Sequence, residues 1–354
     1  MRVRTNSLRS LDTAGNGIQD EGEWNGSQPF MLLAGDIGGT KTLLGLFDQQ
    51  PSRPRAILIR AFTTLDFPDL NAMIAAFADE SGGRGAGIAT ACFGVAGPVI
   101  NDTAELTNVP WRVDAPTIGR AFGIPRVLLL NDLQATAYAV PVLHGDELHT
   151  LQAGKAVEGG DMALIAAGTG LGQALLHRVD GRFVSSPSEA GHADWGARNE
   201  REISVLRSLI HRFGRAEVEQ VVSGQGLVNL HRVTHPGACP AVEDADDPDA
   251  PAAISRAALE RTCERCMEAL SIFVDAYGAE AGNVALRSMA TGGVFISGGI
   301  APKILPALVD GRFMRAFLEK APLDGMLSRV PVKVVLNTDA GLLGAAVHAA
   351  AARA

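Results

Sequence analysis

Short apolar runs alternate with amphipathic segments from Phe30 to the C-terminus. Compact apolar runs bounded by Gly, Pro, Asn or Asp are typical of strands, and apolar positions three or four residues apart are typical of helices. We therefore predict strands over residues 31–34, 43–47, 56–62, 89–95, 126–130, 163–167, 173–177, 294–296 and 332–336. Helices are predicted over residues 70–78, 116–122 and 203–213, and one long helix is predicted from Ile254 to Tyr277. Strands interleaved with helices predict an α/β fold with a mainly parallel sheet.

A unit of two strands joined by a glycine turn occurs twice along the chain. Residues 32–47 form a strand, a glycine turn and a second strand, and residues 163–177 repeat this order around Gly168–Gly172. Around Gly168–Gly172, two uncharged strands joined by so short a glycine-rich turn predict a hairpin. Since the two units lie about 130 residues apart, we expect two related halves rather than one continuous sheet.

The composition narrows the functional classes. The chain has 354 residues, enough for about two domains. It has 31 Lys and Arg against 39 Asp and Glu, a net charge of −8, whereas nucleic-acid binders carry a basic surplus. No apolar run reaches the roughly 18 residues that a membrane span needs, and no apolar stretch follows the N-terminal arginines as in a secretory signal. We expect a cytoplasmic protein that binds neither nucleic acid nor membrane.

Residues 1–29 are polar and carry no apolar periodicity. We expect them to form a disordered tail, with Met31 as an alternative natural start. A tail of this length is too short for a helix-turn-helix domain.

The first candidate site is the loop GDIGGTKT, residues 35–42. Paired glycines let backbone N–H groups approach an anion, and a carboxylate at a strand end can orient a hydrated Mg²⁺. The loop is not a Walker A motif, because Thr40 separates Gly39 from Lys41 and a strand follows. A tight glycine hairpin without function is the alternative.

Two further glycine loops follow, at residues 168–172 (GTGLG) and 297–301 (SGGIA). The last precedes a helix that we predict from Pro302, and a helix N-terminus suits a nucleotide. Each loop is a weak signal by itself. The order and spacing of the three glycine loops together are a stronger indication of nucleotide binding than any one loop.

Polar residues at strand ends supply the remaining candidates. Asn131 and Asp132 follow a predicted strand directly, where ligands bind in α/β proteins, although a helix N-cap is the alternative. Glu189 and His192 lie in a segment without periodicity and suit a polyol, a metal or nearby backbone. Glu219 is a weaker candidate for the site, with a position on an exposed helical face as the alternative.

Two other features favour structural interpretations. Cys263 and Cys266 form a CxxC on an apolar stripe, so we expect core cysteines, with redox or zinc chemistry as the less favoured alternative. Five carboxylates between Ala238 and Ala252 predict a solvated acidic loop rather than a cation site.

Taken together, these motifs resemble the bacterial glucokinases of the hexokinase–actin ATPase superfamily, from about Leu32 to the C-terminus. The segments that carry the resemblance are 35–42, 106–111 (LTNVPW), 129–132 (LLND), 168–172, 188–194 (SEAGHAD), 219–229 (EQVVSGQGLVN) and 297–301. The resemblance implies a two-lobed actin/hexokinase-like (ribonuclease H-like) α/β fold, with mixed sheets flanked by helices. It implies a small domain of residues 30–141 plus 336–354 and a large domain of residues 142–335.

The resemblance also implies an activity, transfer of the ATP γ-phosphoryl group to the 6-hydroxyl of glucose, with Asp132 as general base. Glucose would be held by Asn108, Asn131, Asp132, Glu189, His192 and Glu219. Mg²⁺ would be held through water by Asp36. Nucleotide would contact Gly35, Asp36, Gly38, Gly39, Thr40, Lys41, Gly168, Thr169, Gly170, Gly298 and Gly299. A homodimer is implied as well.

Two departures and two alternatives remain open. Lys41 stands where many members of the family carry Asn. Related sugar kinases bind structural zinc through a Cys-rich cluster after the GlyHis segment. This chain has residues 195–198 (WGAR) there instead, which argues against zinc at that position. The alternatives are a kinase for another hexose or an N-acetylated amino sugar, and a non-catalytic sugar-sensing regulator of the same fold. The phosphoryl donor, ATP or polyphosphate, is also open.

Overall fold

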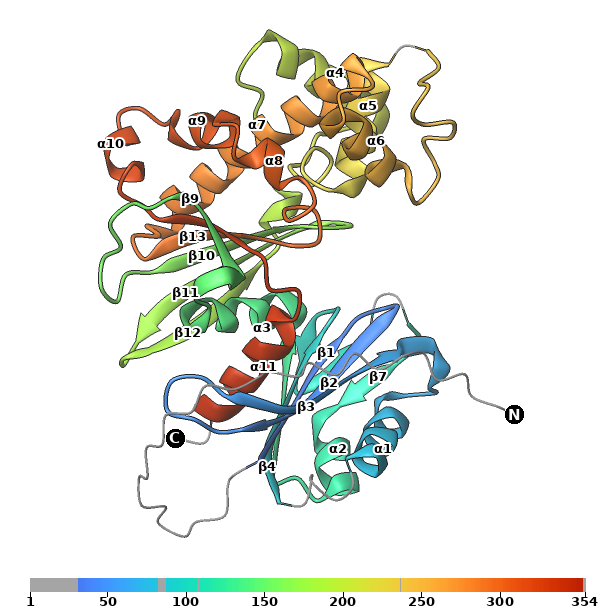
Figure 1. Ribbon diagram of the computed structural model, residues 1–354, viewed down its shortest axis with the longest axis vertical. Coiled ribbons are helices and arrows are strands. Elements are labelled where there is room, and N and C mark those ends of the chain that lie inside the picture. The colour runs from blue at the N-terminus through green and yellow to red at the C-terminus, as the bar shows by residue number, and fades with distance from the viewer. Residues whose placement is uncertain (1–30, 82–86, 107–108, 236, 353–354) are drawn as a thin grey trace, which may run out of the picture.

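The computed structural model describes residues 31–81, 87–106, 109–235 and 237–352. The predicted tail of residues 1–29 and the predicted sugar ligand Asn108 therefore lie outside the described residues. Two lobes, each built on one sheet, lie one above the other, and α3 and α11 lie between them (Figure 1). Within the described ranges, no helix has both the length and the apolar character needed to cross a bilayer.

The first sheet has the strand order β3-β2-β1-β4-β8. Its strands are β1 (Met31–Ile37), β2 (Lys41–Asp48), β3 (Arg55–Thr63), β4 (Ile88–Val95) and β8 (Arg126–Asn131). β1 pairs antiparallel with β2 and parallel with β4. A small separate sheet contains β5 (Val99–Ile100), β6 (Thr103–Glu105) and β7 (Arg112–Asp114).

The second sheet has the order β12-β11-β10-β13-β14-β9. Its strands are β9 (Leu148–Gln152), β10 (Met162–Ala167), β11 (Leu171–Val179), β12 (Arg182–Ser188), β13 (Gly293–Ser297) and β14 (Val332–Val335). β10 pairs antiparallel with β11 and parallel with β13, as β1 does with β2 and β4. The two predicted hairpins and the two related halves are confirmed.

The helices cover both sheets. They are α1 (Leu70–Glu80), α2 (Ala115–Phe122), α3 (Asp132–Ala139), α4 (Glu200–Phe213), α5 (Gly224–Thr234), α6 (Ala250–Leu259), α7 (Glu264–Ser288), α8 (Leu305–Leu308), α9 (Arg312–Leu318), α10 (Asp324–Leu327) and α11 (Ala340–Ala351). Single 3-10 turns occur at η1 (Thr64–Asp66), η2 (Val140–Val142), η3 (Gly145–Glu147) and η4 (Ala190–His192).

Three sequence predictions are wrong. The sheets are mixed rather than mainly parallel, because each glycine hairpin adds antiparallel strands to a parallel core. The predicted helix from Ile254 to Tyr277 is two helices, α6 and α7, because Arg261 adopts a left-handed backbone (φ 59°) and the Thr262 N–H donates to Ala257. The helix predicted from Pro302 is α8, which begins only at Leu305.

α3 and α11 join the two lobes. Gly344 of α11 lies so close to α3 that a Cβ there would overlap the Ala135 carbonyl oxygen. On one side this pair packs on the first sheet with Leu32 and Cys92, and on the other side Leu343 and Ala137 pack on the second sheet. The expected domain division at residues 141/142 and 335/336 stays a prediction.

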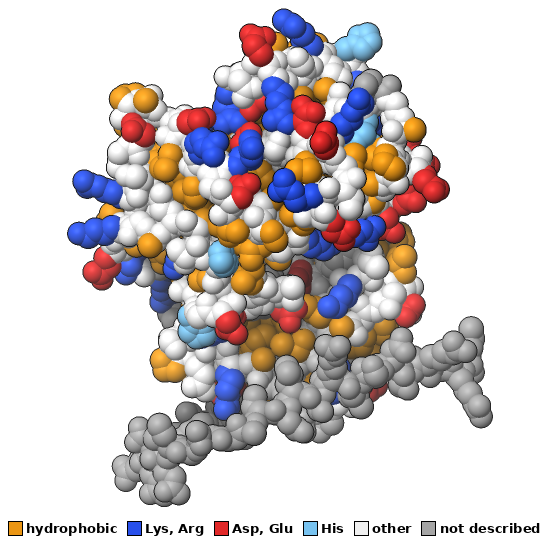
Figure 2. Space-filling view, turned by 45° about the horizontal axis from the view of Figure 1, so that its top comes forward, with side chains coloured by type: hydrophobic (Ala, Val, Ile, Leu, Met, Phe, Trp, Pro, Cys, Tyr) orange, Lys and Arg blue, Asp and Glu red, His pale blue; other side chains and the backbone are white. Residues whose placement is uncertain are grey.

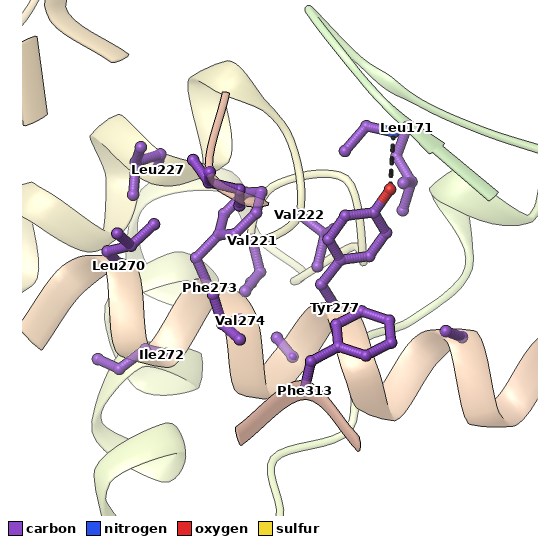
Figure 3. Packing of buried hydrophobic residues seen from close by; sticks show 14 of the residues in the cluster. Leu171, Val221, Val222, Leu227, Leu270, Ile272, Phe273, Val274, Tyr277 and Phe313 are labelled. Atoms are coloured by element: carbon purple, nitrogen blue, oxygen red, sulfur yellow. Dashed lines mark hydrogen bonds between the residues drawn. The ribbon is translucent and has the colours of Figure 1, made fainter. Parts of the chain in front are cut away.

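The core under the second sheet is anchored by Tyr277 of α7 (Figure 3). The Tyr277 ring is fully buried and packs edge-on against Phe273 and Phe313. Its hydroxyl accepts a hydrogen bond from the Ala167 N–H at 3.3 Å and donates to the Ser297 carbonyl oxygen at 3.2 Å. Because these residues end β10 and β13, one buried side chain holds both strands where their glycine loops begin.

Candidate active site

A cleft of about 710 Å³ lies between the lobes, where the carboxyl ends of β1, β8, β10 and β13 meet. On the face seen in Figure 2 the surface is hollowed between the lobes, and basic and acidic side chains are intermixed around it. The predicted site residues that line the cleft are Asp36, Asn131, Asp132, Gly168, Thr169, Gly170, Glu189, His192, Glu219 and Gly298. Those absent from its described lining are Gly35, Gly38, Gly39, Thr40, Lys41 and Gly299.

Asp36 projects into the cleft near the end of β1. Burial, together with repulsion from Asp132 and Asp339, raises the pKa of Asp36 from its ordinary 3.8 to about 6, although Lys41 opposes this shift. The carboxylate lies against the first turn of α11, where a Cβ on Gly341 would come within 2.7 Å of Asp36 Oδ2. Asp36 and Asp132 line the same cleft, and two carboxylates there fit a hydrated Mg²⁺, which prefers oxygen ligands.

The first glycine loop closes the β1–β2 hairpin beside Asp36. The Gly38 N–H donates to the Lys41 carbonyl at 3.1 Å, and the Thr64 hydroxyl donates to the Gly38 carbonyl at 2.8 Å. Gly35 is required for packing, because a Cβ there would meet the Phe93 ring at 2.5 Å. The turn is thus a tight hairpin, and Asp36 beside it lines the cleft.

Asn131 and Asp132 form the junction between β8 and α3. Asn131 is the N-cap: its Oδ1 accepts the Leu133 N–H at 3.0 Å, and its amide donates to the Gly97 carbonyl at 3.3 Å. Asp132 is the first residue of α3, and its Oδ1 accepts the same Leu133 N–H at 2.8 Å. Asp132 opens into the cleft, and the cleft walls reduce its hydration, so that burial raises its pKa against the lowering effect of these hydrogen bonds.

The second glycine loop is fastened by Glu219. The Glu219 carboxylate accepts the Leu171 N–H at 2.8 Å, and a Cβ on Gly170 would lie only 2.6 Å from Glu219 Oε2. The Gly168 carbonyl accepts the N–H of Gly224 at the start of α5. The loop is therefore tied to the segment that carries Glu219 and to α5.

His192 ends η4 on the rim of the cleft. Its Nδ1 lies 2.8 Å from Glu217 Oε2, and this hydrogen bond is the main cause that raises the pKa of His192. Arg215 donates to the His192 carbonyl at 3.1 Å and also contacts Glu217. Glu217 therefore orients the imidazole that the sequence singled out.

A second pocket of about 700 Å³ adjoins the cleft and shares Gly168 and Thr169 with it. Gly299 lies here, with Gln225 and Leu227 of α5 and with residues 245–249. The acidic loop is therefore exposed for the most part, as predicted, but it also forms one wall of this pocket.

Sequence reasoning missed Glu217 and Asp339. Glu217 lies two residues before Glu219 in a segment without periodicity, and its partner His192 is 25 residues away. Asp339 precedes α11 and is separated from the end of β14 at Val335 by residues 336–338, so it did not stand out as a strand-end residue as Asp132 did.

Comparisons with known proteins identify a family that spans most of the chain. The family model described as Glucokinase matches residues 33–352. A glucokinase of Nostoc sp. is 40% identical over 345 residues, covering 90% of this chain and 99% of the relative. A glucokinase of Mesorhizobium japonicum is 37% identical over 327 residues, covering 90% of this chain and 92% of the relative.

Solved structures of similar fold were also found. The crystal structure of a glucokinase from an Antarctic psychrotroph matches with a TM-score of 0.82 at 28% identity, covering 91% of this chain and 99% of the other. A ROK family glucokinase from Streptomyces griseus, solved with glucose and AMPPNP, shares the fold with a TM-score of 0.59 at 21% identity, covering 90% and 99%. The expected two-lobed hexokinase-like fold is confirmed. The chain belongs to the glucokinase family and is an enzyme, a hexose kinase.

Proposed function

We propose that this kinase transfers the γ-phosphoryl group of ATP to the 6-hydroxyl of glucose, with Asp132 as general base. The observation that carries the proposal is the position of Asp132, which shares one cleft with Asp36 and with the second glycine loop. Phosphoryl transfer depends chiefly on positioning and electrostatic stabilisation, and this cleft combines one base with two phosphate-side elements.

Asp132 is suited to accept the proton of a sugar hydroxyl. Its carboxylate is held at the start of α3 by the Leu133 N–H and opens into the cleft. Because its pKa is raised, it is a stronger base than a fully solvated aspartate. General base catalysis of this kind contributes about 10²–10⁴-fold to the rate.

Asp36 and its neighbours fit a divalent cation. Burial, and after it repulsion from Asp132 and Asp339, raises the pKa of Asp36, and a bound cation would offset both effects. Mg²⁺, held by Asp36 through water, would neutralise charge on the phosphates of ATP. Gly168 and Thr169 line both the cleft and the second pocket, so we assign the phosphates to this boundary and the nucleoside to the pocket with Gly299.

The glucose hydroxyls would contact Asn131, Glu189, His192 and Glu219 on the remaining walls. Glu219 would serve twice, because its carboxylate also holds the Leu171 N–H of the phosphate-side loop. Glu189 is exposed and Glu219 is half-buried in this structure, and a bound sugar would cover both carboxylates. A covered carboxylate without a hydrogen-bond partner is costly, so these residues would discriminate against sugars that lack the matching hydroxyl.

The direct test is Asp132→Asn, which removes the base and keeps the size of the side chain. We expect turnover to fall by about 10²–10⁴-fold, while glucose binding by calorimetry stays detectable. Asp66→Asn, an exposed position on η1, is the matched control and should retain full turnover. Turnover near that of the wild type in Asp132→Asn would remove Asp132 from its role.

Substrate range is the second question. Glu and His side chains fit several hexoses, so mannose, fructose and N-acetylated amino sugars are the alternative acceptors. A coupled assay of ADP release across a sugar panel, and of sugar phosphate formation with ATP or polyphosphate, compares kcat/KM directly. The proposal requires the highest value for glucose with ATP.

Two further expectations belong to the same proposal. We propose a cytoplasmic location, where the two proposed substrates meet, and a homodimer, which rests on family resemblance. Light scattering coupled to size-exclusion chromatography measures the oligomeric state. A mass twice that of the chain supports the homodimer, and a monomer at assay concentration contradicts it.

A further inference from the structure

Two histidines and two cysteines meet where α5 and α7 pack together. Figure 1 shows both helices in the second lobe, on the side of its sheet that faces away from the first lobe. His231 lies in the last turn of α5 and His235 caps that helix, Cys239 lies in the following loop, and Cys266 lies in the first turn of α7. All four side chains are buried, and one donor atom from each lies within 4.8 Å of the others.

Two distances between donor atoms of this cluster are close to those around a metal ion. Cys239 Sγ lies 3.7 Å from Cys266 Sγ, and His235 Nε2 lies 3.9 Å from Cys266 Sγ. Tetrahedral zinc has Zn–S bonds of about 2.3 Å and Zn–N bonds of about 2.0–2.1 Å, which place two sulfurs about 3.8 Å apart and a sulfur and nitrogen about 3.6 Å apart. The sulfurs are too far apart for a disulfide, whose S–S bond is about 2.05 Å.

The histidines point to the same interpretation. His231 is 5% exposed, and neither of its ring nitrogens has a hydrogen-bond partner among the described residues. An unpaired polar group in the core is costly. His235 Nδ1 lies 3.2 Å from the His231 carbonyl oxygen, so donation there leaves the lone pair of Nε2 for a ligand. Metal-binding histidines commonly donate their other N–H to a backbone carbonyl.

We propose that one structural Zn²⁺ ion binds here, held by His231, His235, Cys239 and Cys266. Thiolate and imidazole ligands favour zinc over Mg²⁺, and a site closed by four protein ligands is structural rather than catalytic. Cys263 Sγ lies 3.3 Å from His235 Nε2 but is half-buried, and it stands outside the four-residue cluster. The site is also separate from residues 195–198, where the sequence lacks zinc ligands.

The ion would fix one wall of the second pocket. It would join the end of α5 to the start of α7, whereas the beginning of α5 holds the Gly168 carbonyl through the Gly224 N–H at 2.8 Å. Leu227 and Val228 of the same helix line the pocket. A clamp at one end of α5 would therefore hold the surface to which we assign the nucleoside.

The first test is the metal content of the full-length protein, purified under reducing conditions without chelator. Inductively coupled plasma mass spectrometry should find one zinc per chain. Removing the metal with a zinc chelator should lower Tm, and adding Zn²⁺ should restore it. Substitution with Co²⁺ should give the visible absorption of tetrahedral cobalt together with thiolate-to-cobalt charge-transfer bands. These measurements need no variant, so a folding defect cannot obscure them.

Variants then assign the ligands. Cys239→Ser, Cys266→Ser, His231→Asn and His235→Asn should each lose stoichiometric zinc. The matched controls are Cys92→Ala, in buried β4, and His211→Asn, exposed on α4, and both should keep it. Cys263→Ser should also keep one zinc.

Three results would overturn the proposal. The first is a wild-type chain that stays free of zinc after incubation with Zn²⁺ under reducing conditions. The second is mass spectrometric detection of a Cys239–Cys266 disulfide as the resting state. The third is loss of zinc from Cys263→Ser with retention in His231→Asn, which would overturn the assignment of His231 as the fourth ligand.

Discussion

Replacing Asp36 with asparagine should stabilise the ligand-free protein while it destroys the activity. Asp36 is held in the cleft beside Asp132 and Asp339, and the folded protein raises its pKa from 3.8 to about 6. The charged form is therefore disfavoured in the folded state relative to the unfolded chain. Asparagine has nearly the same shape and carries no charge, so it removes this cost.

The magnitude follows from the pKa shift. A difference of about 2 pKa units corresponds to about 3 kcal/mol at pH 8, and partial exposure of the side chain makes this an upper limit. Between pH 4 and 6 the folded state binds more protons than the unfolded state, so this group makes the wild type less stable as pH rises through that window, with no further change above it. The advantage of the variant should be about half as large at pH 5 as at pH 8.

Urea unfolding of both proteins at pH 5 and pH 8, without nucleotide or Mg²⁺, measures this difference. Asp66→Asn serves as the control, because its exposed carboxylate should leave the free energy of unfolding unchanged at both pH values. The reasoning is refuted if Asp36→Asn is no more stable than the wild type at pH 8, or if its advantage grows on acidification.

Three other predictions concern the surrounding structure. Glu217→Gln should lower the pKa of His192, measured by NMR titration of its imidazole, because the hydrogen bond with Glu217 is the main cause of the raised value; an unchanged titration contradicts this. Tyr277→Phe should lower the free energy of unfolding by about 1–3 kcal/mol in urea titrations, because it leaves the Ala167 N–H without its buried partner; no loss of stability contradicts this. Saturating glucose should shrink the radius of gyration in small-angle scattering, since the cleft must exclude water before transfer; unchanged scattering argues against closure.

The hairpins of the fold were predictable from sequence because they are built from local signals. In β1–β2 and β10–β11, apolar strands flank short glycine turns, and both the pairing and the repeat followed from that pattern. The edge strands β9 (LHTLQ) and β12 (RFVSSPS) were missed because each is largely polar. The break between α6 and α7 was missed because the apolar spacing continues across the turn at Arg261.

Some residues of the candidate site were likewise predictable from local sequence, and others were not. Strand ends predicted Asp36 and Asp132, because the carboxyl ends of neighbouring strands meet at one edge of a sheet. Partners set by tertiary structure were not predictable: Glu217 is 25 residues from His192, and Cys266 lies 31 residues from His235. His231 and His235 stand four residues apart near the end of an apolar helix, a spacing typical of a metal site that becomes informative only with the cysteines beside it.

The central claim is that the carboxylate of residue 132 takes the proton from the sugar. A crystal structure with glucose and a non-hydrolysable ATP analogue measures this directly, through the distance from the Asp132 oxygens to the 6-hydroxyl oxygen. We predict a hydrogen bond of about 2.6–3.2 Å, with the 6-hydroxyl facing the γ-phosphate. A 6-hydroxyl held by another side chain, with Asp132 turned out of the closed cleft, would contradict it.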